Sequence, residues 1–186
     1  MVIVGKKSKF IDNINKIVND SSHGYDQLKR WGPDYDCSSF IIQCAHDAGY
    51  NIPTGTGNTE TMVNSFKNAG WSVLEFDGNI YDLEPGDIIL RTNHGGDMGH
   101  TEVCVAFKKW AGAHINEKGG VTGGKTGDQT GKEIGYCDPY HIGAYPYDWD
   151  YVICPPKDNE NTVSPDSVKN KLNKIKCDLD EVIKMV

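Results

Sequence analysis

The sequence predicts an α+β domain in which N-terminal helices pack on an antiparallel β-sheet. Two observations lead to this fold class. Apolar residues recur at helical spacing between residues 8 and 68. Short apolar runs separated by Gly, Pro, Asp and Asn then follow between residues 71 and 154. Helices that come first and strands that come later are typical of an α+β domain.

Three helices are expected in the first part of the chain. Residues 8–20 have an apolar face typical of an amphipathic helix. Residues 37–49 have the same spacing and end at Gly49, a frequent stop residue. Asn58 or Thr59 can cap a third helix that runs to about Asn68.

The second part of the chain predicts short strands at residues 71–76, 87–91, 101–107, 111–115 and 151–154. Residues 119–131 are rich in glycine and are expected to form a loop. This loop lacks the Gly-Lys-Ser/Thr ending of a phosphate-binding loop, so we do not expect nucleotide binding.

The domain that carries these elements is expected to span residues 1–156. Residues 157–165 are polar and resemble a linker, and an apolar stripe follows at helical spacing in residues 168–183. We therefore expect residues 157–186 to form a linker and an amphipathic helix, which contacts another copy of the chain or connects to a further module.

Composition excludes several classes of protein. The hydrophobic fraction of 38% fits a soluble globular protein, and no apolar run is long enough to span a bilayer. A net charge of −7 argues against nucleic-acid and membrane partners. The N-terminus lacks the pattern of a secretory signal, so we expect synthesis in the cytoplasm and free thiols.

The six cysteines form no C-x-x-C pair, which makes a structural zinc site an unfavoured interpretation. Cys44 and Cys104 are expected to be small buried apolar residues. Cys137 and Cys154 could pair, although their spacing does not require it.

The chemistry is expected to centre on Cys37. This cysteine follows a turn-rich segment and opens the helix of residues 37–49, where the helix dipole and free N–H groups favour a thiolate. His100 begins a strand downstream, and His114 and Asn116 follow on the next strand, two residues apart and thus on one face. This order is that of a Cys–His hydrolase, in which either His114 or Asn116 orients His100.

Other polar residues near Cys37 and His100 have separate interpretations. His94, Asp97 and His100 share one Gly-rich loop, but they lack helical ligand spacing and a clear fourth ligand, so we predict neither a metal site nor a cofactor. Ser38 and Ser39 are expected to bond locally in the first turn of the Cys37 helix. Strand alternation predicts that Glu102 points to solvent.

These residues resemble the NlpC/P60 superfamily of papain-like cell-wall cysteine peptidases, and more closely its phage-type and clostridial-type peptidoglycan amidohydrolases. The matching motifs lie between residues 20 and 155. They are Tyr35-Asp36-Cys37-Ser38-Ser39-Phe40, the segment of residues 83–90, Gly99-His100-Thr101, His114-Ile115-Asn116-Glu117, residues 127–134 and residues 149–152. Ser39 departs from the Asp-Cys-Ser-Gly form that is common in the superfamily.

The resemblance implies a papain-like fold without a cofactor, with Cys37 as nucleophile, His100 as general base and His114 as the third, orienting residue. It also implies an aromatic residue near the substrate, for which Tyr25 is the nearest candidate. Asp36, Ser38 and Asn116 are the other residues that we expect at the substrate.

The expected function is that of a peptidoglycan hydrolase, either an N-acetylmuramoyl-L-alanine amidase or a stem-peptide endopeptidase, as in a phage endolysin or a tail-associated lysin. Such an enzyme would act at the bacterial cell wall. Two alternatives stay open: a catalytically silent wall-binding module of the same fold, and a Cys–His acyltransferase.

Overall fold

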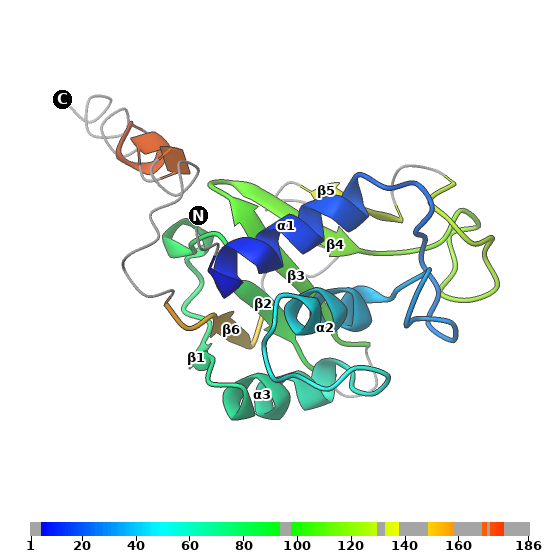
Figure 1. Cartoon of the computed structure of the whole chain (residues 1–186), viewed down its shortest axis with the longest axis horizontal. Coiled ribbons are helices and arrows are strands. Elements are labelled where there is room, and N and C mark those ends of the chain that lie inside the picture. The colour runs from blue at the N-terminus through cyan, green and yellow to red at the C-terminus, as the bar shows by residue number, and fades with distance from the viewer. Residues whose placement is uncertain are drawn as a thin grey trace.

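The computed structural model describes residues 5–93, 98–129, 133–137, 149–157, 169–170 and 172–176 of the chain. The α+β prediction is confirmed, because three helices are followed by a six-stranded antiparallel sheet (Figure 1). The helices are α1 (Lys6–Val18), α2 (Cys37–Asp47) and α3 (Thr59–Asn68). Each lies within two residues of its predicted bounds.

The sheet has the strand order β1-β6-β2-β3-β4-β5. Its strands are β1 (Ser72–Glu75), β2 (Ile88–Arg91), β3 (His100–Ala106), β4 (Lys109–Ala113), β5 (Ile134–Cys137) and β6 (Tyr151–Cys154). A short 3-10 helix, Ile80–Asp82, precedes β2. The long central strand β3 lies between β2 and β4, with His100 opposite Arg91 at one end.

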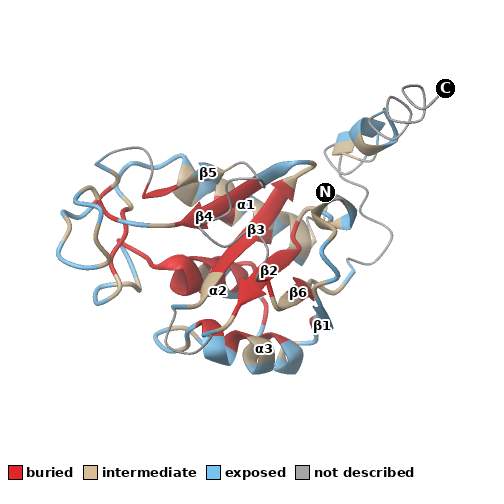
Figure 2. Ribbon diagram, turned by 180° about the vertical axis from the view of Figure 1, so that it is seen from behind, coloured by how far each residue is buried: buried red, intermediate tan, exposed pale blue. Residues whose placement is uncertain are grey.

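Both faces of the central sheet are covered. On one face, side chains of β2, β3, β4 and β6 pack with α1, α2 and α3 into the main core, which includes Phe10, Phe40, Phe66, Val103 and Ala111. On the other face, Ile89, Cys104, Trp110, Trp149 and Val152 form a second buried cluster. Figure 2 shows that buried residues follow β2, β3, β4 and α2, while the loops at the periphery are exposed.

One expectation about the sheet is wrong, one strand was missed, and one open question about cysteine pairing is answered. The strand predicted for residues 111–115 ends at Ala113, so His114 and Asn116 do not share a strand face. The strand β5 was not predicted, because it is a four-residue edge strand with a glycine at its second position. Cys137 and Cys154 lie on β5 and β6, which are separated by three strands, and no disulfide joins them.

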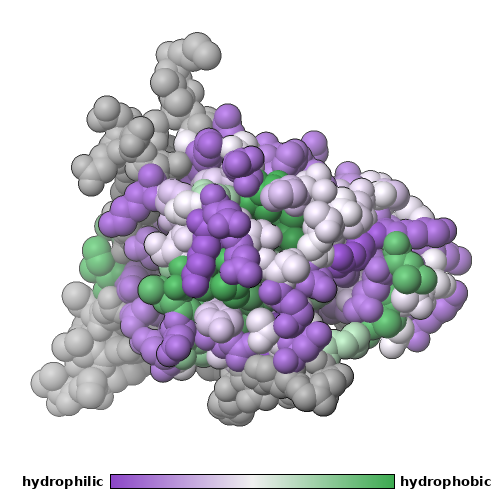
Figure 3. Space-filling model, turned by 90° about the horizontal axis from the view of Figure 1, so that it is seen from below, coloured by the Kyte–Doolittle hydropathy of each residue, from purple (hydrophilic) through white to green (hydrophobic). Residues whose placement is uncertain are grey.

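One further expectation, the burial of two cysteines, is confirmed. Cys44 and Cys104 are buried. Residues 169–170 and 172–176 are helical, and Leu172 and Ile175 are exposed on this segment. No helix within the described ranges is both long and apolar enough to cross a membrane. Figure 3 shows one face of the molecule, on which apolar side chains gather in patches separated by hydrophilic surface.

Candidate active site

Cys37 occupies the first position of α2, as predicted. Asp36 caps the helix: its carboxylate accepts the Ser39 backbone N–H at 2.7 Å, and the Asp36 N–H is bonded to the Ser39 hydroxyl at 2.9 Å. This reciprocal pair is a capping box and stabilises a helix start by about 1 kcal/mol. The serine that departs from the common superfamily form therefore has a structural role beside the nucleophile.

His100 lies at the start of β3, beside Cys37. Its Nε2 atom lies 3.2 Å from a Glu102 carboxylate oxygen, so Nδ1 is the ring nitrogen that remains for the thiol. Burial by itself lowers the pKa of His100, but the hydrogen bonds to Cys37 and Glu102 and the charges of both outweigh it and raise the pKa to about 10. His100 is therefore expected to be an imidazolium at neutral pH.

Glu102 does not point to solvent, and the expectation from strand alternation is wrong. Its side chain is fully buried, because the second cluster covers the sheet face that was expected to be exposed. The carboxylate contacts His100 with one oxygen and accepts a hydrogen bond from the Cys137 thiol at 3.1 Å with the other. A buried carboxylate needs such partners, since an unpaired charge in the interior is strongly unfavourable.

His114 follows β4 and lies beside the same carboxylate. Its Nδ1 atom is 3.8 Å from Glu102 Oε1, and its ring centroid is 5.4 Å from that of His100. Its backbone N–H donates to the Glu133 carbonyl at 2.9 Å, which fixes the chain just beyond the strand. Burial lowers the pKa of His114; the Glu102 charge opposes this change, and the His100 charge adds to it. His114 is therefore the neutral imidazole of the pair at pH 7.

Gly112 has no side chain, and this leaves room for the side chain of Glu102. A Cβ atom at this position would lie 3.0 Å from Glu102 Cγ and 3.3 Å from His114 Cε1. Both contacts are tighter than ordinary van der Waals distances, so a larger residue would displace Glu102 or His114. The glycine at the centre of β4 is thus explained by the site beside it.

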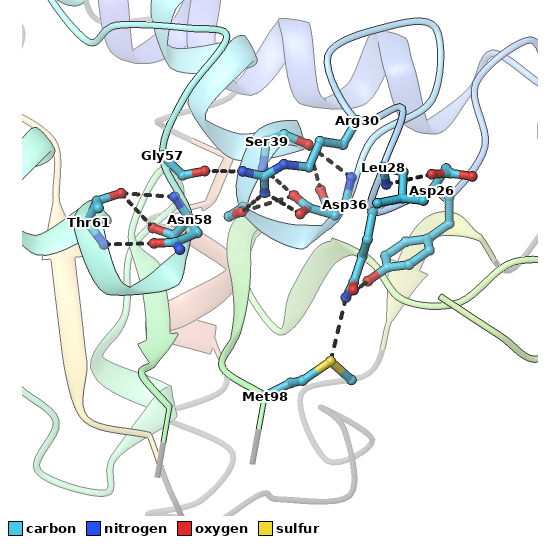
Figure 4. A network of polar contacts seen from close by, with 12 residues as sticks. Asp26, Leu28, Arg30, Asp36, Ser39, Gly57, Asn58, Thr61 and Met98 are labelled. Atoms are coloured by element: carbon cyan, nitrogen blue, oxygen red, sulfur yellow. Dashed lines mark hydrogen bonds and ion pairs between the residues drawn. The ribbon is translucent and has the colours of Figure 1, made fainter. Parts of the chain in front are cut away.

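The predicted substrate residues Asp36 and Ser38 are held in a polar network around Arg30. The Arg30 guanidinium contacts the Asp36 carboxylate and the Gly57 carbonyl, and it lies 3.1 Å from the Ser38 hydroxyl (Figure 4). The Ser38 hydroxyl also donates to Asp36 at 2.9 Å. The network ties the start of α2 to the segment that precedes α3, and local bonding of Ser38 and Ser39 is confirmed.

Tyr25 lies beside the site and is 3% exposed. Its backbone N–H donates to the buried Glu133 carboxylate at 2.8 Å, and its hydroxyl accepts a hydrogen bond from Gln27. Burial, followed by the negative charge of Cys37, raises the pKa of the Tyr25 hydroxyl above its usual value. The hydroxyl is therefore a protonated neighbour of Cys37.

Asn116 is not brought to His100. Its side chain accepts the backbone N–H groups of Lys118 and Gly120 and donates to the Thr122 carbonyl, each at 3.0 Å. It is 3% exposed. Asn116 thus organises the glycine-rich loop rather than orienting His100.

Ligand atoms of His100, Glu102 and His114 all lie within 4.8 Å of one another, which makes these residues a group that could hold a metal ion. The sequence did not predict this group. Of the loop considered earlier, His94 and Asp97 lie outside the described residues.

Sequence reasoning missed Glu102, Cys137 and Arg30. A signal for Glu102 was present, because residues two apart on a strand share a face and Glu102 follows His100 by two. Cys137 had no comparable signal, because its partner Glu102 comes from a distant part of the chain, and the contact of Arg30 with Asp36 depends on how the intervening turn folds.

Comparison with known proteins finds two family models that match the chain. A sequence-family model described as "Bacteriophage peptidoglycan hydrolase" matches residues 14–116, and one described as "Endolysin-like domain" matches residues 111–171. No curated protein matches the chain.

Three solved structures are similar to the chain at low identity. NlpC1 from Trichomonas vaginalis is 19% identical with a TM-score of 0.46, and the match covers 77% of this chain and 42% of that one. NlpC2 from the same organism is 15% identical with a TM-score of 0.48 and coverages of 82% and 47%. Ly7917 is 15% identical with a TM-score of 0.46 and coverages of 81% and 62%. The chain thus spans less than two thirds of the length of each of these proteins.

The first family model covers more than half of the 186 residues, including Cys37, His100, Glu102 and His114. It agrees with the phage-type peptidoglycan amidohydrolases that the sequence motifs resemble. The chain belongs to the family of bacteriophage peptidoglycan hydrolases.

Proposed function

We propose that the protein is a cysteine hydrolase that cleaves an amide bond in the peptide stem of bacterial peptidoglycan. One observation carries the proposal: Cys37 at the start of α2 lies beside His100, and His100 Nε2 lies 3.2 Å from the buried Glu102 carboxylate. A nucleophile, a base and a group that orients the base are the three parts that thiol-dependent acyl transfer needs.

The reaction begins when the Cys37 thiolate attacks the amide carbonyl carbon and forms a C–S bond. The Cys37 backbone N–H, which has no acceptor within the helix, donates to the oxyanion. As the C–N bond breaks, the His100 imidazolium gives its proton to the leaving amine. Water, deprotonated by His100, then hydrolyses the thioester, which releases the acid and restores the thiolate and imidazolium.

Glu102 is the residue that we assign to the orientation of His100, since its oxygen lies 3.2 Å from Nε2. Its negative charge stabilises the imidazolium that the mechanism requires. His114, the third residue implied by the resemblance, contacts the Glu102 carboxylate and acts on His100 through it. His114 is therefore a positioning residue in this proposal.

The ion pair between Asp36 and Arg30 bears on the choice of substrate. Its carboxylate is the acid next to the nucleophile, and it is already bonded to Arg30, Ser38 and Ser39. A positively charged α-amine would have to break these contacts in order to bind there. We therefore favour intact stems that are still amide-linked to the glycan over trimmed stems with a free N-terminus, and both the amidase and the endopeptidase reaction fit such stems.

The remaining proposals concern the setting of the enzyme. Residues 1–156 would form the catalytic domain, and residues 157–186 a linker and helix that contacts another copy or leads to a wall-binding module. The enzyme would act on the cell wall as a released lysin or a tail-associated lysin.

The experiment is a turbidity assay on Gram-positive cell walls, followed by mass spectrometry of the products. Free lactyl–muramic acid groups identify an amidase, and a split stem identifies an endopeptidase. Cys37→Ala should abolish lysis while the circular dichroism spectrum is retained. Full lysis by this variant would refute a thiol nucleophile and favour a metal-dependent hydrolase, whereas a wild-type protein without any lytic activity would favour the silent wall-binding module.

Chemical labelling provides a second test of the nucleophile. Iodoacetamide should modify Cys37 before Cys44 or Cys104, because burial raises the pKa of the Cys44 thiol well above its usual value and that of Cys104 to about 12. Loss of activity should follow the labelling of Cys37.

A further inference from the structure

We propose that His100, Glu102 and His114 form a Zn²⁺ site, and that zinc bound there reversibly inactivates the hydrolase. The inactivation rests on the proposed function, whereas the binding of the ion does not. The three residues come from β3 and from the segment just after β4, two neighbouring strands of the sheet.

The separations of the donor atoms suit a small divalent ion. His100 Nε2 and Glu102 Oε1 are 3.2 Å apart, and Glu102 Oε1 and His114 Nδ1 are 3.8 Å apart. Ligands about 2.1 Å from a tetrahedral zinc are separated by about 3.4 Å. All three atoms lie within 4.8 Å of one another, so a modest rotation of His114, the most exposed of the three side chains, completes the geometry.

The charge of the site favours a cation. Glu102 is fully buried, and its contacts within the described residues are two imidazoles and the Cys137 thiol, with no lysine or arginine among them. A divalent ion would compensate the buried carboxylate directly. Imidazole nitrogens select zinc and its neighbours in the first transition row, whereas magnesium and calcium prefer oxygen ligands.

Zinc at this position would block the mechanism at His100. A neutral imidazole has one nitrogen lone pair. If zinc takes the lone pair of Nε2, Nδ1 carries the proton and can no longer accept one from the thiol or from water. The ion would also replace the hydrogen bond between His100 and Glu102. The proton transfers of the proposed reaction would then stop until a chelator removes the ion.

The test measures binding separately from activity. The full-length protein is stripped with EDTA and titrated with ZnCl₂ by calorimetry and with CoCl₂ by visible absorption. We expect one ion per chain with micromolar or tighter affinity, and a cobalt spectrum of nitrogen and oxygen ligands. His114→Ala and Glu102→Gln should each weaken binding by at least about tenfold. Two substitutions guard against the misfolding of one variant, and circular dichroism checks both.

Two control variants distinguish this site from other zinc ligands. His46→Ala removes a histidine of α2 that bonds to the Ile52 carbonyl, and it should bind zinc as the wild type does. Cys37→Ala should also retain binding. Loss of binding in Cys37→Ala, or its persistence in both His114→Ala and Glu102→Gln, would overturn the proposal, because the ion would then be held by the thiol or elsewhere.

Activity is measured last. One equivalent of zinc should abolish cell-wall lysis by the wild type, and EDTA should restore it. Zinc that stimulates lysis would overturn the inhibitory role. If the stripped protein lyses no wall at all, the proposed function fails, while the binding data still decide whether the site exists.

Discussion

Replacing Glu102 by glutamine removes the negative charge behind His100 while the shape of the side chain is kept. In the structure the carboxylate lies 3.2 Å from His100 Nε2, and it is fully buried. A glutamine amide can still accept the hydrogen bond from the Cys137 thiol, but it cannot neutralise an imidazolium. The substitution therefore tests whether Glu102 stabilises the charged form of His100.

The size of the effect follows from the strength of the lost hydrogen bond. A hydrogen bond to a charged group contributes about 1.5–3 kcal/mol. Because one pKa unit corresponds to about 1.36 kcal/mol, the pKa of His100 should fall by about one to two units. If all of this energy acts in the transition state, kcat/KM should fall by about 10- to 150-fold near neutral pH.

The assay is the pH dependence of kcat/KM for the wild type and the variant. The imidazolium form of His100 is present below its pKa, so wild-type activity should decline as the pH rises through about 10. In Glu102→Gln this alkaline limb should move to lower pH. The free energy of unfolding should also decline at alkaline pH. The pKa of His100 in the folded protein is raised above its usual value of 6.5. The stabilisation by protonated His100 is therefore complete below pH 6.5 and is lost as the pH rises through about 10.

Glu84→Gln is the matched control, since Glu84 forms an exposed ion pair with Lys7 away from the site. It removes the same charge and should leave the alkaline limb in place. An unchanged limb and an unchanged rate in Glu102→Gln would refute the role assigned to Glu102. A shift of equal size in both variants would instead indicate an effect of net charge.

Three further predictions concern the same site. His114→Ala should lower kcat, but by less than Glu102→Gln or Cys37→Ala, because His114 acts through the Glu102 carboxylate. Asn116→Ala should instead lower Tm and leave kcat nearly intact, because the Asn116 amide holds its own loop. If Asn116→Ala proves the more damaging to kcat, the two roles must be exchanged. Gly112→Ala should lower kcat/KM of a folded protein, because its Cβ would lie 3.0 Å from Glu102 Cγ, and a wild-type rate would show that the carboxylate can move without loss. EDTA should not reduce lysis; activity that falls with EDTA and returns with zinc would make the metal part of the catalyst.

Local signals made the helical half of the fold predictable. The helix that carries Cys37 has its cap, its apolar spacing and its glycine stop within a short stretch of sequence, and the structure places its first residue where the pattern does. Asn58 likewise caps α3 with the reciprocal bonds that the sequence allows. Signals of this kind act over a few residues, so no knowledge of the tertiary structure is needed to recognise them.

The edge of the sheet and the role of Asn116 depended on distant parts of the chain. The strand β5 forms because β4 offers a partner, although its own four residues give little indication of a strand. Asn116 falls just beyond β4, and the turn that it stabilises is defined by the backbone of residues 118–122. Neither arrangement can be derived from alternation along a single strand.

Glu102 shows why the candidate site was only partly predictable. Alternation places Glu102 on the same face of β3 as His100, and this much was available from the sequence. Whether that face meets water depends on the second cluster, in which Trp110 and Trp149 cover the strand. Once the face is buried, an acidic residue two positions after a histidine needs a cationic partner, and the imidazole is the nearest one. The burial that made the solvent prediction wrong is thus also the physical reason to assign Glu102 to the support of His100.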